Sequence, residues 1–136
     1  MKKVFADTSY WIALLNPCDA LHAKAVAMPA RLPTASLVTS EMVLGELLNG
    51  LSDAGPWKRS AAISAVETIR RTRSIFVFPQ TADLFARAFE RYKQSADKNW
   101  SLTDCASFQI METERISAAL THDHHFVQAG YEALLR

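Results

Sequence analysis

Short apolar runs alternate with amphipathic stretches along the chain. Short apolar runs are typical of buried strands, whereas apolar positions three and four residues apart are typical of helices that pack on one face. The apolar runs predict strands over residues 3–6, 35–39, 74–78, 117–121 and 131–135. The amphipathic stretches predict helices over residues 9–15, 20–28, 57–71 and 103–114, and two more that run from caps at Ser40 and Thr81 to about residues 51 and 95.

The alternation of strands and helices predicts an α/β domain whose parallel central sheet carries helices on both faces. In such folds a ligand binds at the carboxyl ends of the strands, near the point where the strand order reverses. Side chains that directly follow a predicted strand are therefore the first candidates for a functional site.

The composition is that of an ordinary globular chain. Its 136 residues, 49% hydrophobic and 21% charged, suit a single domain over residues 1–136. No apolar run approaches the roughly 18 residues of a membrane helix. Asp7 interrupts the apolar stretch after the basic start, so we expect a cytoplasmic protein with no membrane association. Cys18 and Cys105 match no metal or disulfide motif and are expected to be small buried residues.

Two aspartates follow predicted strands. Asp7 follows the first strand and Asp123 follows the fourth. Each residue on its own suits a helix cap or a turn. Parallel strands that both end in aspartate point their carboxylates at the same edge of the sheet, and such convergence is what a divalent cation requires.

Two further acids lie on predicted helices. Asp104 lies in the first turn of its helix, where it suits the helix dipole and forms a capping-box pattern with Ser101. Glu46 lies in the middle of its helix, opposite a leucine-rich face, where a solvated glutamate is the default. The residues one turn before Glu46 are apolar, so partial burial of Glu46 at a cleft is the alternative. Glu41 competes with Glu46 for the same role.

The four acids and their flanking residues resemble the PIN-domain family, especially the VapC-type toxins of bacterial toxin–antitoxin pairs. The matching segments are Val4-Phe5-Ala6-Asp7-Thr8-Ser9, Thr39-Ser40-Glu41-Met42-Val43-Leu44-Gly45-Glu46-Leu47, Ser101-Leu102-Thr103-Asp104-Cys105-Ala106-Ser107 and Leu120-Thr121-His122-Asp123-His124-His125-Phe126. Each motif alone is common, but the ordered set of four is fairly specific. The resemblance assigns the glutamate role to Glu46 and not to Glu41.

The resemblance implies a three-layer α/β/α PIN-like fold and a metal-dependent endoribonuclease that cuts RNA to leave a 5′-phosphate. It implies that four residues are catalytic and bind one or two Mg²⁺ or Mn²⁺ ions: Asp7, Glu46, Asp104 and Asp123. Thr8 and Thr121 are candidates to orient these carboxylates through hydrogen bonds. The resemblance also implies a homodimer and a cognate antitoxin protein that inserts a basic side chain into the acidic pocket.

Two other functions are open at this point. A phosphotransferase of the haloacid-dehalogenase type would form an aspartyl phosphate on Asp7 and carry a second aspartate two residues later, where this sequence has Ser9. A non-catalytic PIN-like module would act only by pairing with another protein, and the complete set of four acids argues against it. Cleavage of RNA separates the enzyme from the module.

Histidines gather around Asp123, at positions 122, 124 and 125. Imidazole and carboxylate together can bind transition metals. Because His22 is the only other histidine, a histidine-rich metal shell is hard to assemble. We therefore expect local turn residues here, and a place for one histidine near the RNA is the alternative left open.

Basic and aromatic residues supply the remaining candidates for RNA contact. Two basic runs suit either solvated helix faces or a path for RNA phosphates: Arg70, Arg71 and Arg73, and Arg87, Arg91, Lys93 and Lys98. The net charge of only +1 requires such residues to be clustered. Among the tryptophans, Trp11 is expected in the core or in a dimer contact. Trp100 is the better candidate for stacking on a base, although packing is favoured for it too.

Overall fold

The computed structural model describes residues 2–136, which contain a five-stranded parallel sheet. From one edge to the other, the strands are β3 (Ile75–Phe78), β2 (Ser36–Ser40), β1 (Lys3–Ala6), β4 (Ala118–Leu120) and β5 (Glu132–Ala133). The chain moves outward from β1 to β3 and then returns to the other side of β1 for β4 and β5. The strand order therefore reverses between β1 and β4, and the predicted parallel sheet is confirmed.

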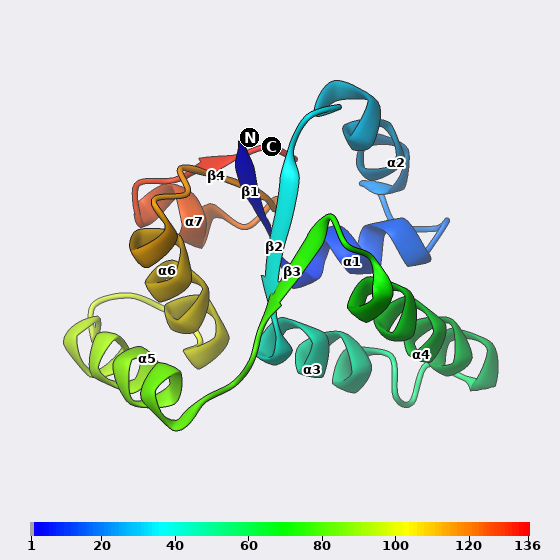
Figure 1. The fold of residues 1–136 in the computed structure, drawn as a ribbon. Helices are drawn as coiled ribbons and strands as arrows, with labels where there is room; N and C mark the ends of the chain where they lie inside the picture. The colour runs from blue at the N-terminus through cyan, green and yellow to red at the C-terminus, as the bar shows by residue number, and fades with distance from the viewer. Residues whose placement is uncertain (1) are drawn as a thin grey trace.

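Within residues 2–136, seven helices accompany the sheet: α1 (Thr8–Leu15), α2 (His22–Arg31), α3 (Glu41–Gly50), α4 (Pro56–Arg71), α5 (Ala82–Gln94), α6 (Leu102–Glu114) and α7 (His124–Gln128). Figure 1 shows α1, α2 and α4 on one side of the sheet and α5, α6 and α7 on the other. Right-handed crossovers produce this division, because the direction of strand addition changes after β3. The three-layer α/β/α fold is confirmed. In the part of the chain that the structure describes, no helix is long and apolar enough to cross a membrane.

Local capping sets where the helices near the sheet edge begin. The Ser40 hydroxyl accepts a hydrogen bond from the Val43 amide at 3.2 Å, and the Thr81 hydroxyl accepts one from the Leu84 amide at 3.0 Å. Both residues have the extended backbone that a helix N-cap requires. The two predicted caps are therefore confirmed, and α3 starts directly at the carboxyl end of β2.

Three local expectations were wrong. We predicted that the second helix would end at Met28, but α2 continues through Pro29 to Arg31, because proline removes only its own N–H and the Leu32 amide still bonds the Met28 carbonyl at 3.1 Å. We predicted that the histidines around Asp123 would be turn residues, but His124 and His125 begin a short helix, α7, with Asp123 in the N-cap role that was one of its two expected roles. Cys18 is exposed in the turn after Pro17, whereas Cys105 is buried as expected.

The core holds the last helix against the sheet. Phe126 of α7 is fully buried and meets the ring of Phe108 in α6 edge-on, with centroids 4.9 Å apart. The centroid of the Phe126 ring also lies 6.4 Å from that of Phe5 in β1. Burial of three aromatic side chains contributes several kcal/mol of hydrophobic stabilisation. These contacts fix the start of α7, and with it Asp123, relative to α6 and β1.

Thr39 links β2 to the end of β1, and its removal tests this part of the fold. Its buried hydroxyl donates to the Ala6 carbonyl at 2.8 Å and lies 3.5 Å from the indole nitrogen of Trp11. Thr39→Val keeps the shape but leaves these groups without the hydroxyl, so we expect a loss of about 1–3 kcal/mol in the free energy of unfolding. Thr39→Ser should retain most of the stability. Urea unfolding of the three proteins checks this, and equal stability of wild type and Thr39→Val would contradict it.

Candidate active site

The candidate site lies at the carboxyl ends of β1 and β4, where the strand order reverses. Asp7 directly follows β1, and its backbone amide bonds the Leu120 carbonyl at the end of β4, at 3.2 Å. Asp123 lies three residues beyond the end of β4. Crevices at such switch points are the usual ligand sites of parallel α/β sheets.

Asp7 is buried, with 6% of its surface exposed. It occupies the N-cap position of α1, but its side chain makes no capping hydrogen bond. Instead, its Oδ2 accepts a hydrogen bond from the Thr121 hydroxyl at 3.0 Å. Burial, together with the smaller effect of the Asp104 and Glu46 charges, raises the pKa of the Asp7 carboxyl from 3.8 to about 7, against the lowering effects of the Thr8 amide and the Thr121 hydroxyl. The metal-free site therefore binds a proton near neutral pH.

The structure separates the two candidate glutamates of α3. The Glu46 carboxylate accepts a hydrogen bond from the Thr8 hydroxyl at 2.6 Å and lies close enough to raise the pKa of Asp7. The Glu41 carboxylate is exposed and accepts a hydrogen bond from the Gln80 amide at 2.7 Å. Glu46 therefore faces the other acids, whereas Glu41 secures the loop between β3 and α5.

Asp104 combines a structural contact with a place in the cluster. It forms a capping box with Ser101, with hydrogen bonds of 3.0 and 3.1 Å, as the sequence pattern predicted. Burial raises the pKa of the Asp104 carboxyl, partly offset by the Ser101 amide, and the nearby Asp123 charge raises the pKa again. The first turn of α6 thus directs this carboxylate toward the carboxyl end of the sheet.

His125 joins Asp104 to Asp123. Its Nδ1 lies 3.0 Å from Asp104 Oδ2 and 3.3 Å from Asp123 Oδ1. Asp123 caps α7 by accepting the His125 amide at 2.9 Å, which places the ring beside both carboxylates. The expectation of simple turn residues was therefore wrong for His125. The contact depends on the position of His125 in the first turn of α7, which Asp123 caps. The sequence pattern did not predict α7, so this contact was missed.

The four acids have no strong cationic partner. Within residues 2–136, no lysine or arginine forms an ion pair with any of them, and His125 and the exposed His124 are the only basic neighbours. The ligand atoms of Asp123, His124 and His125 also lie within 4.8 Å of one another, which is compatible with a metal site. An edge with four converging carboxylates can bind a cation or hold protons.

Other predicted contact residues are more widely distributed. Trp11 is buried in the core, whereas Trp100 packs edge-on against Phe108 at 4.9 Å and donates its indole N–H to Gln128 at 3.1 Å. Arg70 and Arg71 end α4, which leads to the amino end of β3. They therefore lie near the amino ends of the strands, whereas the acids lie at the carboxyl ends. The second basic run lies on α5 and before α6, and its members pair with exposed or half-exposed acids or amides.

Comparison with known proteins identifies the family. The PIN domain model matches residues 4–130. The chain belongs to the PIN-domain family. The 23S rRNA-specific endonuclease VapC20 of Mycobacterium tuberculosis is 34% identical to this PIN domain over 128 residues, which are 94% of this chain and 95% of that protein.

Solved structures agree with the match. The crystal structure of M. tuberculosis VapC20, described as a sarcin–ricin loop cleaving toxin, superposes with a TM-score of 0.84 and covers 94% of this chain and 95% of that one. The crystal structure of FitAcB from Neisseria gonorrhoeae, 16% identical, shares the fold with a TM-score of 0.63 and covers 96% of this chain and 94% of that one. The predicted resemblance to VapC-type endoribonucleases is confirmed by VapC20.

The burial of Asp7 predicts a specific dependence of stability on pH. The unfolded carboxyl ionises near pH 3.8 and the folded one near pH 7, so the metal-free protein loses stability as the pH rises between these values. The loss from this residue amounts to as much as about 4 kcal/mol. We expect Asp7→Asn, which cannot ionise, to gain stability relative to wild type across this range. Thermal unfolding in EDTA at pH 5 and pH 8 checks this, and a constant difference between the two proteins would refute the assignment.

Proposed function

We propose that this PIN domain is a metal-dependent endoribonuclease, and that one or two Mg²⁺ or Mn²⁺ ions bind to four residues: Asp7, Glu46, Asp104 and Asp123. The observation that carries the proposal is the convergence of four carboxylates, two of them buried, on one sheet edge with no lysine or arginine paired to them in residues 2–136. Such a cluster is unfavourable unless it holds protons or a cation.

The donor set fits a hard divalent cation. Glu46, Asp104 and Asp123 each use one carboxylate oxygen in the hydrogen bonds of the described chain, which leaves the second oxygen of each for a ligand. Mg²⁺ prefers such oxygen ligands and keeps several waters. A bound ion of this kind makes water more acidic and offsets negative charge on a phosphate. The histidine-containing alternative is less suitable, because His125 Nδ1 already contacts two carboxylates.

The neighbouring side chains orient the carboxylates. Thr121 holds Asp7 through its hydroxyl proton, and the same hydroxyl oxygen accepts the Asp123 amide at 3.0 Å, so one side chain connects two of the acids. Thr8 fixes Glu46 in the same way. His125 connects Asp104 with Asp123. Because each acid is held through one oxygen, the carboxylates are oriented before a metal ion or RNA binds, which supports the proposal.

The relative supports a proposal for the substrate, and the family resemblance supports one for the partners. VapC20 is described as a 23S rRNA-specific endonuclease and as a toxin that cleaves the sarcin–ricin loop. At 34% identity over nearly the full chain, we propose a structured RNA with an unpaired loop, ribosomal RNA first among the candidates, as the substrate here. We also propose that the protein acts as the toxin of a cytoplasmic toxin–antitoxin pair, that it forms a homodimer, and that a cognate antitoxin places a basic side chain among the acids.

Two glutamates on one helix provide a matched test of the site. Glu46→Gln should lower RNA cleavage on the order of 1000-fold, because several kcal/mol of metal-derived stabilisation of the transition state is lost. Glu41→Gln should cleave at the wild-type rate, since Glu41 faces the Gln80 amide. Asp7→Asn and Asp104→Asn should abolish cleavage while retaining the fold.

We would measure the cleavage rate of each variant on a ribosomal RNA fragment in Mn²⁺. Circular dichroism is the control for folding. A Glu46→Gln variant that cuts at the wild-type rate would remove Glu46 from the mechanism. A folded wild-type protein that cuts no RNA would favour the non-catalytic module.

Metal binding can be tested without knowledge of the RNA. A ligand that binds only the folded state raises stability by mass action, by about 2.7 kcal/mol at a hundred times its Kd. We expect millimolar Mn²⁺ to raise the Tm of the wild-type protein by several degrees at pH 7.5 and to leave Asp104→Asn nearly unchanged. Differential scanning calorimetry of both proteins checks this. Equal responses to Mn²⁺ would show that the ion binds outside the carboxylate cluster.

A further inference from the structure

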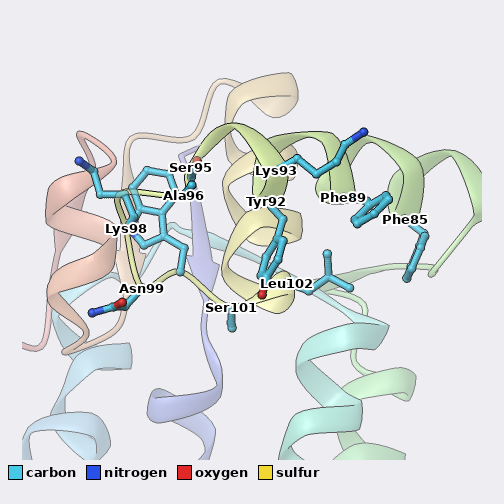
Figure 2. A pocket seen from close by; sticks show the side chains of 11 residues that line it. Phe85, Phe89, Tyr92, Lys93, Ser95, Ala96, Lys98, Asn99, Ser101 and Leu102 are labelled. Carbon is cyan, nitrogen blue, oxygen red and sulfur yellow. The ribbon is translucent and has the colours of Figure 1, made fainter.

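A groove of about 910 Å³ lies beside the acid cluster, between α5 and the segment that leads into α6. Figure 2 shows Tyr92 pointing from α5 toward Ser101 and Leu102, with Phe89 and Phe85 following along the helix. Phe85, Phe89 and Tyr92 are spaced four and three residues apart, so they share one face of α5. This row of rings spans about 10 Å along the helix.

The aromatic row is not used by the core. Its side chains are 43%, 46% and 49% exposed, whereas Ala88 on the other face of α5 is fully buried against α6. Exposed aromatic rings in a row are costly to leave in water and are typical of a binding surface. Base stacking on aromatic rings is the main sequence-tolerant contact of proteins with unpaired nucleotides.

The charged groups of the groove favour an anionic ligand. Lys93 and Lys98 line it, and no carboxylate does. The Lys93 ammonium lies 5.1 Å from the centre of the Phe89 ring. Lys93 pairs with Glu90 at 2.7 Å and Lys98 with Asp97 at 2.9 Å, but surface pairs of this kind are weak and can give way to a phosphate.

The groove adjoins the candidate site. Ser101 lines the groove and also caps α6 through its reciprocal hydrogen bonds with Asp104. A strand whose phosphate lies at the carboxylates can therefore continue past Ser101 along α5. The hydroxyl and amide groups of Ser95 and Asn99 at the same groove supply hydrogen-bonding partners for bases or riboses.

We propose that this groove binds unpaired nucleotides of the RNA substrate next to the cleaved bond, with bases on the Tyr92, Phe89 and Phe85 rings and phosphates near Lys93 and Lys98. This inference rests on the proposed function and adds the surface of the protein that binds the unpaired nucleotides. A second copy of the chain is the competing occupant. RNA is favoured over a second copy because the groove adjoins the acid cluster at Ser101 and is lined by two lysines and no carboxylate.

The test compares ring-removing and ring-keeping variants. For a hairpin RNA with an unpaired loop, Tyr92→Ala should raise KM about 5- to 100-fold with kcat nearly unchanged, because a stacking contact outside the reacting group is lost. Tyr92→Phe should stay near wild type. Trp57→Ala is the control, since Trp57 is 67% exposed on α4, across the sheet. Lys98→Ala should reduce the slope of log binding constant against log salt concentration by about one, because one phosphate contact is lost.

Binding of the fluorescent hairpin and of a fully paired duplex is measured in EDTA as well, and sedimentation gives the oligomeric state of each variant. Weaker hairpin binding by Tyr92→Ala, with unchanged duplex binding and assembly, supports the inference. Unchanged KM and Kd overturn it, and so does a Tyr92→Ala variant that dissociates from dimer to monomer. A wild-type protein that binds the loop through Tyr92 but cuts nothing refutes the proposed function and leaves the groove inference standing.

Discussion

Asp7 places a carboxylate at the end of the central strand, where the surrounding chain excludes nearly all water. The carboxylate lies near Glu46 and Asp104, whose charges oppose its ionisation, and only hydroxyl and amide groups offset that effect. A group in this position is neutral or cation-bound, since an unpaired buried charge costs several kcal/mol. The rest of the site follows this constraint, because hydroxyl and amide groups each hold an acid through one carboxylate oxygen and leave its second oxygen free.

Helix capping and acid placement use the same hydrogen bonds. The capping box of Ser101 starts α6 and orients Asp104, and the cap of α7 orients Asp123. A side chain that satisfies the first amides of a helix cannot rotate freely, so both carboxylates are held without additional structure. The capping role and the functional role of these acids, which compete when the sequence is considered alone, are therefore compatible in the fold.

Much of this arrangement could be predicted from local patterns. Apolar runs located the strands, and the caps at Ser40, Thr81 and Ser101 located three helices, because these signals depend only on nearby residues. The contact of His125 with Asp104 could not be predicted, since it depends on a helix of five residues that is too short to show periodicity. The choice between Glu46 and Glu41 came from the family resemblance, and physically it depends on which way α3 leaves β2.

The hydrogen bond from Thr121 to Asp7 joins residues 114 positions apart, at opposite ends of the chain. Loop closure of this length comes late in folding, after local pairs such as β1 with β2 can form. On a translating ribosome, the first three strands and their helices can therefore assemble while the acid cluster is still incomplete. A nascent chain of this kind lacks Asp123 and the Thr121 contact of Asp7 until its last segments emerge, so the acid cluster is completed only at the end of synthesis.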